Sequence, residues 1–209
     1  MIDSGPVYVV EDDTAVRMTI CNVLEEFGFR VRDFATAEEF LADVESDAVG
    51  CLITDLDMPG MGGMELHRRL YSANSVLSVV VVTGVADVSD AIEVMERGAV
   101  TLLQKPYEVP DLIAAIHKGQ RQSERRDRRR KENRDVARRI QSLSEEERQV
   151  MDLMVAGGPN KLISTTLSMS MRTVDRRRKA VLEKMHAETV MELVALVATH
   201  RTDGAASAN

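Results

Sequence analysis

Aromatic residues are scarce in this 209-residue sequence: they make up 3% of it, and tryptophan is absent. Residues 142–200 contain no aromatic residue at all. Proteins that bind RNA or single-stranded DNA commonly stack the bases on aromatic side chains. The shortage therefore argues against single-stranded nucleic acid as a ligand of the C-terminal part of the chain.

Cysteines and long apolar stretches are scarce as well. Cys21 and Cys51 each lie in an apolar segment, with neither CxxC spacing nor a nearby histidine, so we interpret both as core thiols. No apolar run approaches the roughly 20 residues that cross a bilayer, and no charged leader precedes a long apolar stretch. These absences predict a soluble, cytoplasmic protein with no membrane partner.

The net charge of −7 conceals two halves of opposite sign. Residues 1–117 carry 21 acidic and 7 basic side chains, whereas residues 118–209 carry 13 acidic and 20 basic ones. The N-terminal part therefore has a charge of −14 and the C-terminal part a charge of +7. A basic region of this kind is typical of a nucleic-acid-binding domain, although the whole chain is acidic.

The N-terminal part alternates short β-branched runs with longer amphipathic ones, as βα units around a parallel sheet do. The expected strands are 6–11, 30–34, 50–55, 79–83 and 101–103. The expected helices are 15–27, 37–45, 64–71, 88–97 and 109–118. The run Val79–Val82 has no polar alternation, so it suits a central strand that helices cover on both faces. The sequence predicts a doubly wound α/β domain.

The C-terminal part reads as helical throughout. Helix formers dominate its charged beginning, which we interpret as a helical linker. Ser144 and Glu147 have the spacing of a capping box, and they begin a four-helix pattern with expected helices 145–156, 160–167, 170–184 and 190–200. The predicted organisation is a first domain at 1–118, a linker at 119–141, a helical domain at 142–201 and a flexible tail at 202–209.

Polar side chains gather where the expected strands end. Glu11 and Asp12 follow the first strand, Asp55 ends the third, Thr83 ends the fourth and Lys105 follows the fifth. The ligand crevice of a doubly wound sheet lies beyond these strand ends, so the side chains should converge there. Three carboxylates repel one another without a cation, and an all-oxygen set suits Mg²⁺. Asp55 can then attack phosphorus, while Mg²⁺, Lys105 and Thr83 balance the charge of the acyl phosphate.

Four motifs resemble those of the receiver domains of two-component response regulators, over about residues 5–118. They are Val9-Val10-Glu11-Asp12-Asp13, Thr54-Asp55-Leu56-Asp57-Met58-Pro59-Gly60, Val82-Thr83-Gly84 and Gln104-Lys105-Pro106. The resemblance implies a flavodoxin-like fold of strand order 2-1-3-4-5 and a cis peptide bond between Lys105 and Pro106. It also implies that Asp55 is the phosphoacceptor and that the metal ligands are Glu11, Asp12, Asp55 and the backbone carbonyl of Asp57.

Two positions depart from the receiver pattern. Leu102 stands three residues before Lys105, where the family usually has an aromatic residue that takes part in its switch. An aromatic relay is therefore absent, although Thr83 can still move towards the phosphate and remodel the surface of residues 84–102. Glu11 replaces the more usual aspartate and lengthens one arm of the metal site.

Two of the expected C-terminal helices have the spacing of a helix-turn-helix, in which the second helix enters the major groove. One face of this second helix carries the candidate base readers Arg172, Asp175, Arg176 and Lys179. Arginine and lysine at such positions reach guanine edges or phosphates. Lys161 and Arg177 are further candidates for contacts with phosphate.

Residues 143–194 resemble the LuxR-type helix-turn-helix, and the order of the two domains points to the FixJ/NarL family of response regulators. The resemblance rests on Ala156-Gly157, Pro159-Asn160-Lys161, Arg172-Thr173-Val174 and Lys184-Met185. It implies that Asp175, Arg176 and Lys179 contact the edges of DNA bases and that Thr173 contacts a phosphate. Gly158 replaces a common leucine and Arg177 a common histidine, so local packing and contacts should differ.

The combined resemblance implies a transcription factor that accepts a phosphoryl group on Asp55 from a sensor histidine kinase. We expect phosphorylation to repack the surface of residues 84–103, to favour a homodimer and to promote binding to double-stranded DNA. The chain would assist its own phosphorylation and dephosphorylation without being an enzyme in the usual sense.

Two other functions stay open on the sequence alone. Asp55-Leu56-Asp57 also satisfies the D-x-D motif of haloacid-dehalogenase-like phosphatases, although Pro59 stands where they have a threonine. A metal-dependent phosphohydrolase of that kind would leave the basic half unexplained. In the second alternative, the helical domain is degenerate: it no longer binds DNA and acts through contacts with other proteins. The acidic residues Asp175 and Glu183 on the second helix of the helix-turn-helix favour this alternative.

Overall fold

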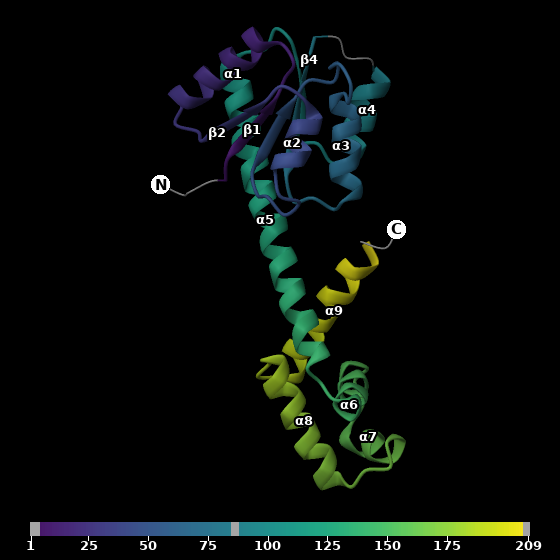
Figure 1. Ribbon diagram of the computed structural model, residues 1–209. Coiled ribbons are helices and arrows are strands. Elements are labelled where there is room, and N and C mark those ends of the chain that lie inside the picture. Colours follow the sequence, from purple (N-terminus) through teal and green to yellow (C-terminus); the bar gives the residue numbers. More distant parts are fainter. Residues whose placement is uncertain (1–4, 85–87, 207–209) are drawn as a thin grey trace. The chain divides into compact units, whose positions relative to one another are not determined.

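The computed structural model describes residues 5–84 and 88–206 (Figure 1). The chain folds into two compact units, Met1–Arg128 and Arg129–Asn209. Their division falls inside the segment 119–141, which we predicted to be a linker. Among the described residues, no helix is long and apolar enough to span a lipid bilayer.

The described residues of the first unit form a five-stranded sheet of order β2-β1-β3-β4-β5, in which every strand pair is parallel. The strands are β1 (Val7–Val10), β2 (Val31–Phe34), β3 (Cys51–Thr54), β4 (Ser78–Thr83) and β5 (Thr101–Gln104). The predicted flavodoxin-like fold and its strand order are confirmed. The Lys105–Pro106 peptide bond is cis, as the resemblance implied.

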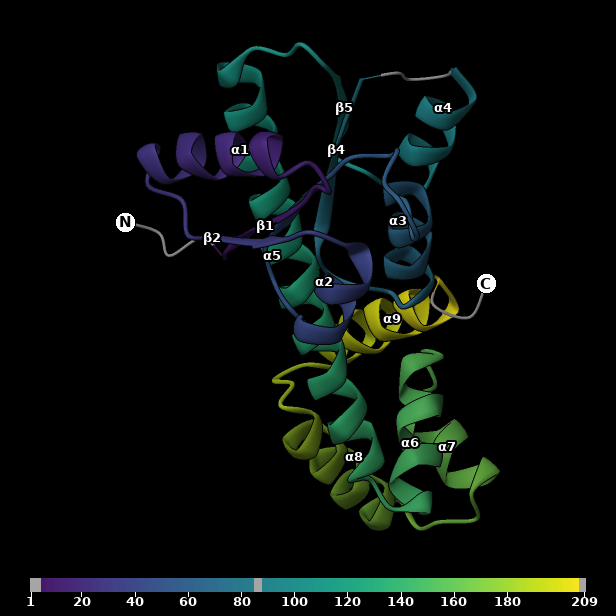
Figure 2. The ribbon, with the colours of Figure 1, turned by 45° about the horizontal axis from the view of Figure 1, so that its top comes forward.

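Helices cover both faces of this sheet (Figure 2). One face carries α1 (Thr14–Glu26) and the first part of α5 (Val109–Gln141), and the other carries α2 (Ala37–Asp43), α3 (Gly63–Ser72) and α4 (Val88–Glu96). The central strand β4 contributes side chains to the hydrophobic cores on both faces of the sheet. Val79 and Val81 pack with the side chains of α2–α4, whereas Val80 and Val82 pack with those of α1 and α5. This double burial explains why the run lacks polar alternation.

Both cysteines are buried free thiols in the core beneath α1 and α5. Burial raises the pKa of Cys51 to about 12 and that of Cys21 to about 11, so both stay uncharged at neutral pH. The interpretation of these residues as core thiols is confirmed.

Helix α5 continues through residues 119–141, and its first turns beyond Lys118 still belong to the first unit. Gln120 and Ser123 are buried there. Gln120 Nε2 donates a hydrogen bond of 2.6 Å to the carbonyl oxygen of Gly5, and Ser123 Oγ accepts one of 2.9 Å from the backbone N–H of Gly50. These polar contacts attach α5 to the segments that lead into β1 and β3.

The second unit is built from the last turns of α5 and the helices α6 (Glu145–Val155), α7 (Asn160–Thr166), α8 (Met171–Met185) and α9 (Val190–Ala206). Its core gathers apolar side chains from each of them, including Val136 of α5 and Val150, Ile163, Val174 and Leu193 of the others. The predicted capping box is present: Ser144 N donates to Glu147 Oε2 at 2.8 Å, and Glu147 N donates to Ser144 Oγ at 3.3 Å.

The expected flexible tail over residues 202–209 overlaps the last helix. Helix α9 extends to Ala206, so residues 202–206 are helical. Alanine is the strongest helix former, and Ala205 and Ala206 favour the extra turn. Residues 207–209 lie outside the described residues.

Candidate functional site

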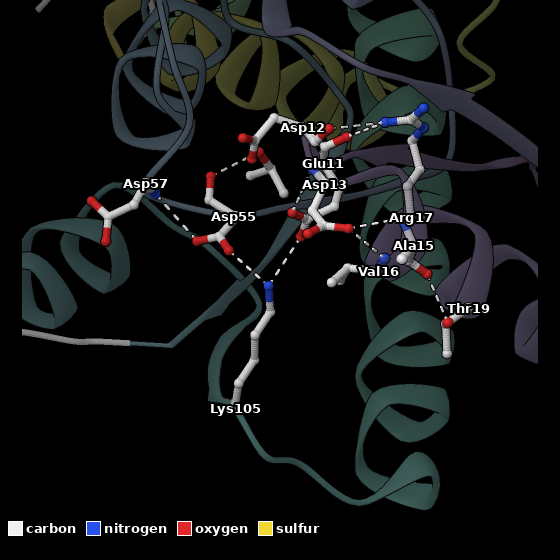
Figure 3. A network of polar contacts seen from close by, with 11 residues as sticks. Glu11, Asp12, Asp13, Ala15, Val16, Arg17, Thr19, Asp55, Asp57 and Lys105 are labelled. Atoms are coloured by element: carbon white, nitrogen blue, oxygen red, sulfur yellow. Dashed lines mark hydrogen bonds and ion pairs between the residues drawn. The ribbon is translucent and has the colours of Figure 1, made fainter.

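A lysine lies among the carboxylates at the carboxyl ends of the strands (Figure 3). Glu11 follows β1, Asp55 follows β3 and Lys105 follows β5. Lys105 Nζ donates hydrogen bonds of 2.7 Å to Asp55 Oδ2 and 3.0 Å to Glu11 Oε2. The side chains of Asp55 and Glu11 are only 12% and 6% exposed. The two carboxylates therefore share one amine, and their side chains are largely shielded from water.

Two opposing effects act on the pKa of Lys105. Partial burial lowers the pKa, whereas the hydrogen bonds and charges of Asp55 and Glu11 raise it, and the net result is a pKa above its ordinary value. The side chain is therefore an ammonium at neutral pH. Its positive charge beside Asp55 can balance the negative charge that a phosphoryl group brings to this carboxylate.

The other predicted pocket residues lie nearby at different depths. Thr83 is fully buried at the end of β4, and its backbone carbonyl accepts a 2.8 Å hydrogen bond from Lys105 N. Asp12 and Asp57 are exposed, and Asp57 N donates to Asp55 Oδ1 at 3.2 Å. Leu102 is partly buried and packs against the core beneath α2–α4. We expect phosphorylation to repack the surface of residues 84–103, and residues 85–87 of that surface lie outside the described residues.

The carboxylates of Glu11, Asp12 and Asp55 are oxygen ligands of the kind that Mg²⁺ takes. Within residues 5–84 and 88–206, however, no three acidic, histidine or cysteine side chains lie close enough together to hold a metal ion. Mg²⁺ usually keeps several waters and needs only one or two carboxylates. The oxygen donors therefore fit Mg²⁺ in kind, with water completing its coordination.

Two charged residues that the sequence analysis did not single out support the pocket loop. Arg17 Nη1 donates a 2.7 Å hydrogen bond to the backbone oxygen of Glu11. Asp13 caps α1 by accepting hydrogen bonds from the backbone of Val16 and Ala15, and these bonds lower its pKa. An aspartate directly before a helix is a start signal, which identifies this role from sequence.

Gly63 is a further residue that the sequence analysis missed. A Cβ atom there would lie 1.9 Å from the backbone oxygen of Asp55 and 2.9 Å from Thr54 Oγ1. Only glycine therefore lets the first turn of α3 approach the backbone that carries Asp55. Glycine weakens a helix, so the pair Gly62-Gly63 at the start of an expected helix was a sequence signal that a close backbone approach requires glycine there.

The second unit contains the predicted helix-turn-helix, formed by α7, a short turn and α8. Ser170 caps α8 by accepting a hydrogen bond from Thr173 N, and the hydroxyl of Thr173 lies 2.9 Å from that of Ser170. One face of α8 is fully buried through Val174, Val181 and Met185. The predicted DNA-contacting residues that are exposed are Lys161, Arg172, Asp175, Arg176 and Lys179.

Arg177 lies in a different environment from the other predicted DNA contacts. It forms ion pairs with Glu146 and Glu147 of α6. Glu147 is buried, and Lys184 of α8 donates a 2.6 Å hydrogen bond to it. Hydrogen bonds from Lys184 and from the Ser144 backbone lower the pKa of Glu147. Arg177 and Lys184 thus hold the reading helix against α6.

Comparison with protein families covers both units. Residues 7–117 match the response regulator receiver domain, and residues 141–197 match the bacterial regulatory proteins of the luxR family. The chain belongs to the two-component response regulators. This response regulator is 39% identical over 196 residues to the transcriptional regulatory protein FixJ of Bradyrhizobium diazoefficiens, covering 94% of this chain and 96% of that protein. It is also 39% identical to FixJ of Rhizobium meliloti, covering 90% and 92% of the two chains.

Solved structures agree with this assignment. The response regulator StyR has a TM-score of 0.81 to this chain at 33% identity, covering 92% of this chain and 98% of StyR. Full-length FixJ from B. japonicum has a TM-score of 0.57 at 38% identity, covering 95% and 98%. A receiver joined to a LuxR-type DNA-binding domain makes this FixJ-like response regulator a transcription factor. The phosphohydrolase alternative is therefore not supported.

Proposed function

We propose that this response regulator accepts a phosphoryl group on Asp55 from a sensor histidine kinase, and that the modified chain dimerises and binds double-stranded DNA. The observation that carries the proposal is the hydrogen bond from Lys105 to Asp55, beside Glu11, at the carboxyl ends of the strands. Such a regulator would work in the cytoplasm, where its DNA lies.

In the proposed transfer, a carboxylate oxygen of Asp55 attacks phosphorus, and the bond between phosphorus and the histidine nitrogen of the kinase breaks. The electron pair of that bond stays on the imidazole. Lys105 and the Thr83 hydroxyl then face the new phosphoryl oxygens as donors, which stabilises their charge. The same arrangement assists later attack by water on phosphorus, which breaks the bond to the Asp55 oxygen, releases inorganic phosphate and returns Asp55 to its free carboxylate.

The carboxylates of Glu11, Asp12 and Asp55, with the backbone carbonyl of Asp57, are the proposed Mg²⁺ ligands. Mg²⁺ bound there supplies positive charge to the phosphoryl group during transfer. Phosphoryl transfer depends mainly on positioning and electrostatics, so the pocket needs no general base.

The proposed output is a change around Thr83 and Leu102 that favours a homodimer. Leu102 is aliphatic and packed in the core beneath α2–α4, so coupling here would proceed through packing and not through a moving ring. In the second unit, the proposed DNA contacts are Lys161, Arg172, Thr173, Asp175, Arg176, Arg177 and Lys179.

Intact-mass analysis and sedimentation of the purified chain, with Mg²⁺ and a small-molecule phosphodonor, test this proposal. We expect one phosphoryl group per wild-type chain and a doubling of the sedimenting mass. Asp55→Asn should show neither change. Asp57→Asn is the matched control, because only its backbone is proposed to act, and it should be labelled like the wild type.

DNA binding is tested separately with duplex DNA over a range of salt concentrations. The affinity of the phosphorylated chain should fall as salt rises, because phosphate contacts release counterions. Arg176→Ala and Lys179→Ala should each weaken binding and reduce this salt dependence. Wild-type labelling without any duplex binding would instead favour a helical domain that acts through protein contacts.

A further inference from the structure

We infer that Asp175 selects cytosine at one position of the DNA site and that Asn160 positions its carboxylate for this contact. The inference rests on the proposed DNA binding and adds the base that is read and a residue that orients the reader. Its starting observation is a 2.7 Å hydrogen bond from Asn160 Nδ2 to Asp175 Oδ1, which joins the first residue of α7 to α8.

The placement of Asp175 on α8 points it to the groove side. It lies in the first turns of α8, and the amino-terminal residues of a reading helix are those that contact base edges. The buried face of α8 holds Val174, Val181 and Met185. At about 100° per residue, Asp175 lies about a quarter turn from this buried face, on the exposed side of the helix that also carries Arg176 and Lys179.

Hydrogen-bond chemistry narrows the base that Asp175 can accept. An ionised carboxylate only accepts hydrogen bonds. It therefore cannot pair with guanine O6 and N7 or thymine O4, which are acceptors too. The major-groove donors are the amino groups of cytosine and adenine. In adenine the acceptor N7 lies next to that amino group and repels a carboxylate. Cytosine N4 is therefore the matching partner.

An acidic side chain at a surface that faces DNA phosphates is repelled by their negative charge. Contact with Asn160 reduces this repulsion. Its amide gives Asp175 one fixed donor, which restricts the rotation of the carboxylate and offsets part of its negative charge. A carboxylate accepts about four hydrogen bonds, so capacity for a base remains. Asn160 is thus a positioning residue, and Asp175 is the residue that determines the base.

Selection of duplexes from a library with randomised sequence, using the phosphorylated full-length chain, tests the inference. The wild type should enrich cytosine at a position where Asp175→Asn enriches adenine, because an amide pairs with adenine N6 and N7. Preference for cytosine there should fall by about 10-fold or more, the equivalent of one hydrogen bond to a charged group. Asp175→Glu keeps a carboxylate and should retain cytosine.

Asn160→Ala should weaken the cytosine preference at the same position and leave the other positions unchanged. Lys161→Ala, at the neighbouring position of α7, should lower affinity for all sequences without altering the preference. If Asp175→Asn selects the same bases as the wild type, the inference is overturned while DNA binding stands. Failure of the phosphorylated wild type to bind any duplex at low salt would overturn the proposed function itself.

Discussion

At the residue scale, Glu147 places a negative charge inside the second unit. It is buried, caps α6 with Ser144, and accepts a hydrogen bond from Lys184. Replacing it by glutamine removes the charge that these donors face. We expect Glu147→Gln to lower the free energy of unfolding by about 1–2 kcal/mol at pH 7, measured by urea denaturation of residues 129–209.

The pH dependence of that loss follows from the lowered pKa of Glu147. A carboxylate with a lowered folded-state pKa contributes stability above its unfolded pKa of about 4.3, and this contribution disappears as the pH falls through the folded-state pKa. The variant and the wild type should therefore converge in acid. Glu145→Gln, at an exposed position on the same helix, is the control and should change stability by less than about 0.5 kcal/mol.

Gly63 controls the backbone position of Asp55. Because a Cβ atom at Gly63 would overlap the Asp55 carbonyl oxygen, Gly63→Ala must displace one of the two backbones. A displacement of about 1 Å typically costs on the order of 100-fold in rate, so labelling by a phosphodonor should slow by about that factor. A folded Gly63→Ala chain that is labelled at the wild-type rate would show that the Asp55 loop adapts without loss.

At the scale of elements, α5 and β3 pack at a separation that only glycine permits. A Cβ atom at Gly119 would lie 2.7 Å from Cys51 Sγ. Overpacking costs about 1–3 kcal/mol, which exceeds the gain of about 1 kcal/mol from the better helix propensity of alanine. Gly119→Ala should therefore destabilise the receiver in urea denaturation followed by tyrosine fluorescence, since all three tyrosines lie in this unit.

Cys51→Ala supplies the control for this packing. With the sulfur removed, the added methyl group at residue 119 has room, and only the helix propensity remains. Gly119→Ala should then stabilise the Cys51→Ala background by about 0.5–1 kcal/mol. The same sign of effect in both backgrounds would mean that Cys51 does not limit the approach of α5 to β3.

At the scale of the whole molecule, the receiver extends further along α5 than its family match at residues 7–117. Gln120 and Ser123 lie beyond that match and are buried in polar contacts with the first unit. A fragment of residues 1–128 should therefore be more stable than a fragment of residues 1–118. We expect a difference of about 1–3 kcal/mol by urea denaturation. Equal stability would show that these contacts contribute nothing net.

Local patterns were sufficient for much of this response regulator. The alternation of apolar runs predicted the doubly wound sheet, the spacing of Ser144 and Glu147 predicted a capping box, and the strand ends predicted a pocket around Asp55 and Lys105. Each of these depends on residues close in sequence or on a rule of sheet topology. The base readers, the metal ligands and the phosphoacceptor stay predictions, since they depend on groups that the chain meets in solution.

The tertiary structure decided which distant groups meet. Asn160 and Asp175 are 15 positions apart, Gln120 and Gly5 are 115 apart, and no periodicity marks either pair. The same holds for Gly63 against the Asp55 carbonyl and for Arg177 against the carboxylates of α6. Hydrophobic period and capping are local properties, so the pattern of residues was enough to predict the helices, the strands and the doubly wound class of the first unit. Contacts between elements depend on how close their backbones pack, and only the folded chain sets that distance.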